Sequence, residues 1–199
     1  MSHQSNPFST RFVRPGAIPF RFNQGETAHS LIEKLQSNHW QGEIIGPHGT
    51  GKSTLLEALI PEIENHGRSI VLLKLSAPNP KLSWSQLLAA HWTYRTQVII
   101  DGYEQLGWLS RSILGLRRRL PGAGMLVTAH QPTGFPKLYQ TTVNEQLAIS
   151  LVEQLTQRGE AIVAKEEVVQ ALHASRGNLR DTLFQLYDLY ESRKSDRSY

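Results

Sequence analysis

Short apolar runs and stretches of helical periodicity alternate along the first 143 residues. The runs are continuous rather than alternating, which is typical of strands that are buried on both faces of a parallel sheet. They predict strands at 42–45, 69–76, 97–102 and 124–130, with a weaker fifth strand at 138–142. The pattern therefore predicts the α/β class, with a parallel sheet that is flanked by helices.

Helices are predicted wherever apolar residues recur at intervals of three and four. The first such stretch begins after Thr27, a suitable cap, and the second follows the strand at 42–45. Pro61 is expected to end or kink this second helix, because proline has no backbone N–H to donate. Further helices are predicted at 82–90, 106–120, 144–157, 165–175 and 178–192.

The two ends of the chain differ from this pattern. The first 25 residues are rich in proline and glycine, so we expect little regular structure there. Four phenylalanines of this segment are expected to pack onto the rest of the chain: Phe8, Phe12, Phe20 and Phe22. The expected organisation is an irregular segment at 1–25, an α/β core at 26–143, a helical part at 144–192 and a frayed tail at 193–199.

Composition narrows the class of protein. The chain has 199 residues, of which 39% are hydrophobic, which suffices for one α/β domain with a true core. Its net charge of +4 is scattered, so nucleic acid would be bound only through its charged backbone. The absence of cysteine excludes disulfides and thiolate metal sites. No secretory signal and no apolar run of roughly 20 residues is visible, so we expect a cytoplasmic protein without a membrane partner.

The most informative motif is a G-x-x-x-x-G-K-S sequence between a predicted strand and a predicted helix. Its glycines let successive backbone N–H groups point at phosphate oxygens, and the helix N-terminus adds positive charge. Lys52 is placed to contact the β- and γ-phosphates, and Ser53 to ligate Mg²⁺. The motif predicts ATP and Mg²⁺ as ligands, and the binding residues are Gly46, Pro47, His48, Gly49, Thr50, Gly51, Lys52, Ser53 and Thr54.

Polar residues end two further predicted strands. Asp101 is expected to be the second Mg²⁺ anchor, although an Asp-Gly turn is a structural alternative. Glu104 either orients the attacking water or caps the helix that follows. Thr128 and His130 both end the next strand, where either polar side chain could face the γ-phosphate. A polar residue without a function is the alternative, and Thr128 is the one we include among the candidate nucleotide-binding residues.

Arg180 lies where an arginine is unfavourable. Asn178 and Asp181 form a helix cap, so Arg180 falls in the first helical turn. The helix dipole disfavours a cation there by about 0.3–1 kcal/mol. An anionic partner would explain the arginine: either a phosphate, or a surface ion pair with Asp181 or Glu191, which would be worth little.

Together these residues resemble the AAA+ ATPases, and more closely the compact branch that includes replication-initiation and signal-transduction ATPases. The resemblance covers residues 26–192 and rests on the phosphate loop, the two strand ends and the segment Gly177-Asn178-Leu179-Arg180. It implies a five-stranded parallel sheet and a helical lid at 144–192, with ATP in the cleft between them. It also implies that Arg180 contacts the nucleotide from the lid and that residues 12–25 are candidates for contacting adenine.

Two features depart from the family pattern. Gly102 stands where the family usually has glutamate, so a catalytic base would have to be Glu104. No arginine occurs from Ala129 to Gln157, where the family's trans-acting finger normally lies. The run Arg117-Arg118-Arg119 comes earlier, at a predicted helix C-terminus that favours cations in any case.

The sequence thus favours an ATP-binding protein whose slow or partner-stimulated hydrolysis drives a conformational switch on a protein partner. Two alternatives stay open: a small-molecule kinase of the P-loop type and a non-hydrolysing, nucleotide-dependent interaction module. A kinase would carry lid arginines that clamp the transferred phosphoryl group, and residues 129–157 contain none. Gly102 supports the module, because it supplies no carboxylate.

Overall fold

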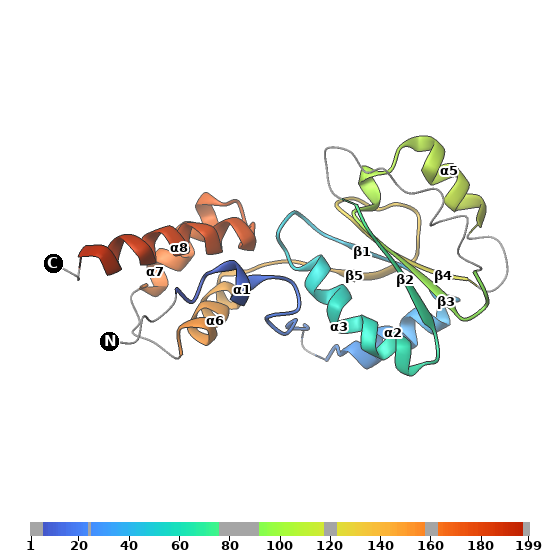
Figure 1. Cartoon of the computed structure of the whole chain (residues 1–199), viewed down its shortest axis with the longest axis horizontal. Helices are drawn as coiled ribbons and strands as arrows, with labels where there is room; N and C mark the ends of the chain where they lie inside the picture. The colour runs from blue at the N-terminus through green and yellow to red at the C-terminus, as the bar shows by residue number, and fades with distance from the viewer. Residues whose placement is uncertain (1–5, 24, 76–91, 118–122, 158–162, 197–199) are drawn as a thin grey trace. The chain divides into compact units, whose positions relative to one another are not determined.

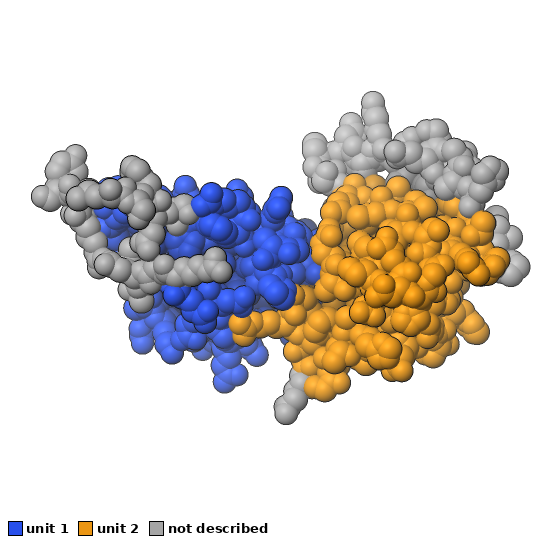
Figure 2. Space-filling model, turned by 60° about the horizontal axis from the view of Figure 1, so that its bottom comes forward, with its two compact units in different colours: residues 1–19, 47–54, 141–199 blue, residues 20–46, 55–140 orange. Residues whose placement is uncertain are grey.

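A computed structural model describes residues 6–23, 25–75, 92–117, 123–157 and 163–196. The chain divides into two units, which are coloured blue and orange in Figure 2. The first unit comprises residues 1–19, 47–54 and 141–199, and the second comprises residues 20–46 and 55–140. The helix predicted at 82–90 lies outside the described residues.

The second unit is built on a five-stranded parallel sheet with the order β2-β3-β4-β1-β5 (Figure 1). Its strands are β1 (Gln41–Ile45), β2 (Ser69–Lys74), β3 (Thr96–Asp101), β4 (Gly124–Ala129) and β5 (Lys137–Gln140). All five predicted strands are confirmed, and so is the α/β class. The continuous apolar runs of β3 and β4 are explained by their central place, since β4 is buried throughout and β3 is buried up to Ile100.

The register of the sheet brings the ends of three strands together. Ile45 pairs with Ala129, and Ile100 pairs with Val127, so β1, β3 and β4 end at the same edge. The carboxyl edge of a parallel sheet is where ligands of open α/β folds bind. The residues at or directly after these strand ends, including Gly46, Asp101 and His130, are therefore neighbours along that edge.

Helices and turns cover both faces of the sheet. On one face, α2 (Ala28–Ser37) and α3 (Lys52–Asn65) bury Leu31, Ile32, Leu35, Leu55, Leu59 and Ile63 against Ile44, Ile99, Leu126 and Leu138. On the other face, the 3-10 helix η1 (Tyr103–Gln105) and α5 (Trp108–Arg117) pack on a second apolar cluster. Thr27 caps α2 as predicted, since its side chain accepts a hydrogen bond from Ser30 N.

Pro61 lies inside a helix, although proline is unfavourable there. The helix α3 continues through Pro61 to Asn65, so of the two expected outcomes the helix end is excluded, and the kink stays a prediction. Leu59 and Ile63, on either side of the proline, are fully buried. Burying such a side chain is worth about 1.5–3 kcal/mol, which offsets the cost of about 3 kcal/mol that an interior proline imposes.

The first unit contains three C-terminal helices, α6 (Glu145–Thr156), α7 (Lys165–Ala174) and α8 (Leu179–Asp196). All three were predicted, but α8 runs to Asp196 instead of ending at 192. Arg193 explains the extension, because its guanidinium donates two hydrogen bonds to the Glu167 carboxylate of α7. The same hydrogen bonds, together with one from Ala164 N, hold the pKa of Glu167 below its usual value.

The N-terminal segment is part of this helical unit. It is largely irregular, as predicted, with one short helix, α1 (Thr10–Val13). Phe8 is fully buried in the core of the three helices and packs edge-on against Tyr190. Asn6 donates hydrogen bonds to Tyr187 O and to Glu191 Oε1 of α8. Phe20 and Phe22 pack in the second unit, where Phe20 contacts Tyr139 edge-on.

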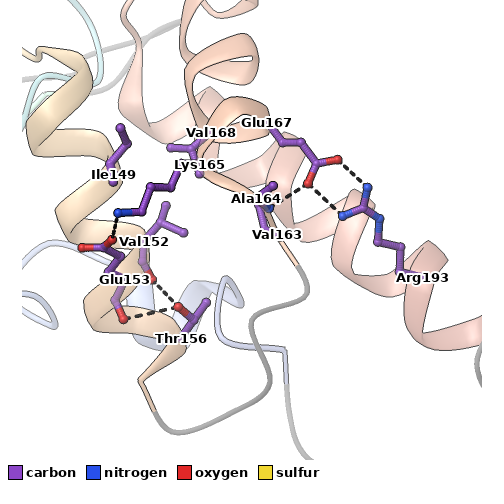
Figure 3. A pocket seen from close by; sticks show the side chains of 10 residues that line it. All are labelled: Ile149, Val152, Glu153, Thr156, Val163, Ala164, Lys165, Glu167, Val168 and Arg193. Atoms are coloured by element: carbon purple, nitrogen blue, oxygen red, sulfur yellow. Dashed lines mark hydrogen bonds and ion pairs between the residues drawn. The ribbon is translucent and has the colours of Figure 1, made fainter.

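A pocket of about 580 Å³ opens between α6, α7 and α8 (Figure 3). Its charged side chains form pairs with one another, Lys165 with Glu153 and Arg193 with Glu167. These pairs satisfy the charges within the helical unit, so the pocket offers no free charge from these residues to a ligand. Among the described helices, none is long and apolar enough to cross a membrane.

Candidate nucleotide-binding site

The glycine-rich loop has the backbone that its motif requires. Gly46 follows β1 directly, and α3 begins at Lys52, which gives the order of strand, loop and helix. Gly49 has a φ of 70°, in the left-handed region that favours glycine. A Cβ atom at Gly49 would lie 1.7 Å from Asn178 Oδ1, so a larger residue would displace the Asn178 side chain in addition to straining the backbone.

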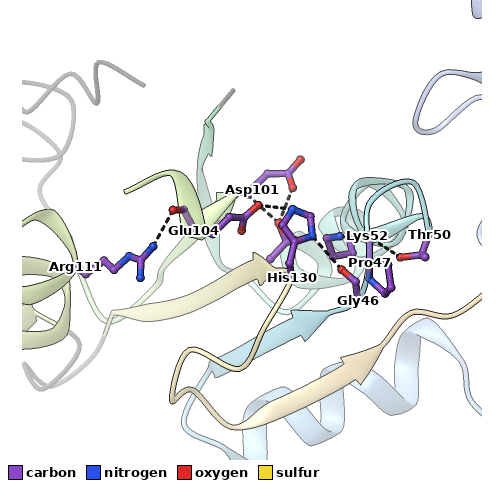
Figure 4. A network of polar contacts seen from close by, with 10 residues as sticks. Gly46, Pro47, Thr50, Lys52, Asp101, Glu104, Arg111 and His130 are labelled. Carbon is purple, nitrogen blue, oxygen red and sulfur yellow. Dashed lines mark hydrogen bonds and ion pairs between the residues drawn. The ribbon is translucent and has the colours of Figure 1, made fainter. Parts of the chain in front are cut away.

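Polar side chains inside the loop are directed at its own carbonyl groups. Lys52 Nζ donates to Pro47 O at 2.7 Å, and Thr50 Oγ1 donates to the same oxygen at 2.8 Å (Figure 4). Lys52 is 9% exposed, so its ammonium is held within the loop rather than in bulk water. Thr50 Oγ1 also lies 2.6 Å from Thr141 Oγ1, next to the helical part of the chain. His48, by contrast, is exposed.

The N-terminus of α8 lies against this loop. Asn178 caps the helix as predicted, because its Oδ1 accepts hydrogen bonds from Arg180 N and Asp181 N. The backbone N of Arg180 would lie 3.3 Å from a Cβ atom at Gly49. The Arg180 side chain is exposed and has no ion-pair partner among the residues that the structure describes, and Glu191 is engaged by Asn6. The surface ion pair considered for Arg180 is therefore not formed.

Asp101 and Thr128 form a second polar group, at the carboxyl edge of the sheet. Thr128 Oγ1 donates to Asp101 Oδ1 at 2.7 Å and accepts from Gly102 N at 2.9 Å. Thr128 is 1% exposed, so its hydroxyl orients the half-buried Asp101 carboxylate. That Thr128 contacts the nucleotide itself stays a prediction.

Glu104 is held by His130, a contact that sequence reasoning did not predict. Glu104 Oε1 lies 2.8 Å from His130 Nε2, and His130 Nδ1 lies 3.2 Å from Gly46 O (Figure 4). Glu104 Oε2 is buried and has no hydrogen-bond partner among the described residues. The carboxylate therefore does not cap α5, which begins later, at Trp108. The signal in the sequence was a second polar residue after Thr128 at the end of the same strand.

The hard oxygen donors suit Mg²⁺ in character. Mg²⁺ is usually bound through one or two protein ligands, with phosphates and waters completing an octahedron. Each of the two predicted ligands, the hydroxyl of Ser53 and the carboxylate of Asp101, is a donor of this kind. Within the described part of the chain, no cluster of three or more acidic, histidine or cysteine side chains could hold a metal without a nucleotide.

The backbone at Gly102 favours glycine over the glutamate that the sequence resemblance would have led us to expect. Its φ of 92° is left-handed, and a Cβ atom there would lie 2.7 Å from Leu75 O. Both features exclude a side chain at this position. The run Arg117-Arg118-Arg119 at the end of α5 is not placed, because the Arg117 side chain and Arg118-Arg119 lie outside what the structure describes.

We expect Gly102→Ala to lower the free energy of unfolding by about 1–3 kcal/mol, because it adds a steric clash to backbone strain. Two matched variants separate the causes. Gly134 has a similar φ of 89°, but a Cβ atom there would meet no other atom within 4 Å, so Gly134→Ala adds backbone strain without a clash. Gly107 has no positive φ and its Cβ would also lie in open space, so Gly107→Ala adds neither strain nor a clash. Chemical denaturation should show the largest loss in the free energy of unfolding for Gly102→Ala, a smaller loss for Gly134→Ala and the smallest for Gly107→Ala. A Gly102→Ala protein as stable as the wild type would contradict this account.

Comparison with known proteins defines the class of fold. A Walker-type ATPase from Pyrococcus abyssi is 12% identical, with a TM-score of 0.55 over 89% of this chain and 69% of that one. DnaA from Aquifex aeolicus, in a structure with AMPPCP bound, is 14% identical, with a TM-score of 0.52 over 90% of this chain and 68% of its own. No protein-family model and no curated protein matches the chain.

These similarities, with the parallel sheet and the glycine-rich loop, show a P-loop NTPase fold. Within that class the fold is AAA+-like, as the resemblance of the sequence implied.

Proposed function

We propose that the protein binds ATP with Mg²⁺ and uses slow or partner-stimulated hydrolysis to switch its conformation. One observation carries the proposal: the N-terminus of α8, with Asn178 and Arg180, lies against Gly49 of the phosphate loop. A helix N-terminus and an arginine without an ion-pair partner together favour an anion, and the loop motif is specific for phosphates. The bound AMPPCP of the DnaA structure agrees with this assignment.

In this proposal the backbone of residues 46–54 binds the phosphates. Lys52 exchanges its hydrogen bond to Pro47 O for bonds to the β- and γ-phosphates. Ser53 and Asp101 hold the Mg²⁺, which neutralises charge on the phosphates when bound. Arg180 adds a charge-assisted hydrogen bond from α8, so that the nucleotide state acts on the helical unit.

Hydrolysis is proposed to be slow in the isolated protein. Gly102 has no side chain, which leaves Glu104 as the general base. Its buried Oε2 has no hydrogen-bond partner among the described residues, and a water molecule is a fitting proton donor to it. The missing arginine after Thr128 removes a group that is worth about 10³–10⁵ in rate in other P-loop enzymes. A protein partner that supplies a cation would raise the rate.

A non-hydrolysing interaction module is the second candidate. It is favoured by Gly102, which supplies no carboxylate beside Asp101, and by the contact of Glu104 Oε1 with His130 Nε2, which occupies one of the two carboxylate oxygens. Incubation of the full chain with γ-labelled ATP separates the two. Release of labelled phosphate supports hydrolysis, and tight binding without release supports the module. Label on an acceptor would indicate a kinase, and no binding would contradict the nucleotide site itself.

Arg180→Ala should weaken ATP binding more than ADP binding, if its guanidinium reaches the γ-phosphate. A charge-assisted hydrogen bond is worth about 1.5–3 kcal/mol, or on the order of 10- to 100-fold in affinity. Calorimetric titration of both nucleotides measures the difference. Arg176→Ala is the matched control, because Arg176 is also exposed but precedes the helix cap. Equal shifts for ATP and ADP would exclude the γ-phosphate contact.

A further inference from the structure

Arg111 of α5 holds the turn that carries Glu104. Its Nε donates to Leu106 O at 2.9 Å, and its Nη2 donates to Glu104 O at 2.7 Å (Figure 4). Its guanidinium carbon also lies 5.6 Å from the centroid of the Tyr103 ring. One side chain thus contacts three residues in and next to η1, a short 3-10 helix that is too short to be rigid by itself.

Glu104 is consequently fixed at both of its ends. Arg111 binds its backbone carbonyl, and His130 lies within hydrogen-bond distance of its Oε1. Between these two contacts, Oε2 is buried and has no hydrogen-bond partner among the described residues. A buried carboxylate oxygen is stabilised by a hydrogen-bond donor, and a water molecule is a fitting donor at this place.

We propose that Arg111 is a positioning residue for catalysis, which places Glu104 Oε2 at the attacking water. The inference rests on the proposed role of Glu104 as the general base. Positioning carries much of enzymatic catalysis, and a displacement of about 1 Å can cost on the order of 100-fold in rate. Only arginine suits the task, because its planar fork bridges two carbonyl groups, whereas lysine presents a single point of charge.

The test measures kcat and KM for ATP hydrolysis by the full chain. Arg111→Gln should lower kcat roughly 10-fold, as expected for a lost charge-assisted hydrogen bond, with KM and ATP affinity unchanged. Arg111→Lys should recover only part of the rate. Arg95→Gln is the matched control, because Arg95 is also exposed and stacks on a tyrosine, Tyr94. It should hydrolyse ATP like the wild type.

A double-mutant cycle makes the inference specific. In a Glu104→Gln background, Arg111→Gln should lower the rate no further, because Arg111 acts through Glu104. Equal losses in both backgrounds, or wild-type kcat in both Arg111 variants, would overturn the positioning role alone. Wild-type turnover in Glu104→Gln itself would instead overturn the proposed base, and this inference with it. Thermal unfolding of each variant shows whether it is folded. If Arg111→Gln does not fold, the comparison of Arg111→Lys with the wild type still tests the positioning role.

Discussion

Replacing Lys52 by alanine should abolish tight binding of MgATP while the chain still folds. The ammonium of Lys52 donates to Pro47 O within the phosphate loop. Alanine therefore removes polar contacts of the loop and takes no side chain out of an apolar core, so we expect the variant to fold. The triphosphate, by contrast, loses the cation that faces its β- and γ-phosphates, so we expect a loss of affinity of at least roughly 100-fold.

Calorimetry with MgATP measures the effect, and thermal unfolding measures the cost to the fold. Lys165→Ala is the matched control, because Lys165 forms an exposed ion pair with Glu153 that is worth little. It should bind ATP like the wild type. An unchanged affinity in a folded Lys52→Ala protein would rule out the nucleotide site, whatever the fold resembles.

The strands could be predicted because burial on both faces leaves a local signature in the sequence. β3 contains the continuous apolar run Val98–Ile100 and β4 the run Met125–Val127, since both faces of these strands are covered. The path of α3 through Pro61 could not be predicted, because the local rule for proline was overridden by apolar burial on either side of it. The end of α8 was missed for a related reason, since its last turn is stabilised by a contact between Arg193 and Glu167 that is distant in sequence.

The candidate site also contains some features that depend on local sequence and others that depend on contacts between distant residues. The place of residues 46–51 between a strand and a helix, and of Asp101 at the end of β3, could be predicted from a motif and from an apolar run, both of which are local. Their roles in binding nucleotide and Mg²⁺ stay predictions. The pair of Glu104 and His130 joins residues from different strand ends, and only the register of β3 and β4 brings them together. The contact of Asn178 with Gly49 is equally non-local. Gly102 signalled a departure from the family, but its steric cause, the carbonyl of Leu75, is visible only in three dimensions.

The second large effect is expected for Glu104→Gln, which should lower ATP turnover by about 100-fold or more, the usual contribution of a general base. The substitution is nearly isosteric, and the amide oxygen can still face His130 Nε2, so the turn at η1 should keep its place. What is lost is the ability of the second oxygen to accept a proton from water. ATP affinity should stay at the wild-type value, because no phosphate contact is assigned to Glu104.

Steady-state phosphate release and ATP titration, run on the same preparation, measure the two quantities. Glu57→Gln is the matched control, since Glu57 pairs with the exposed Lys74 and should turn over like the wild type. The wild-type rate itself should be well below the value of about 10 s⁻¹ that is typical of enzymes, because Gly102 supplies no carboxylate. If Glu104→Gln hydrolyses ATP at the wild-type rate, Glu104 serves only as the hydrogen-bond acceptor for His130, and the base must be sought elsewhere.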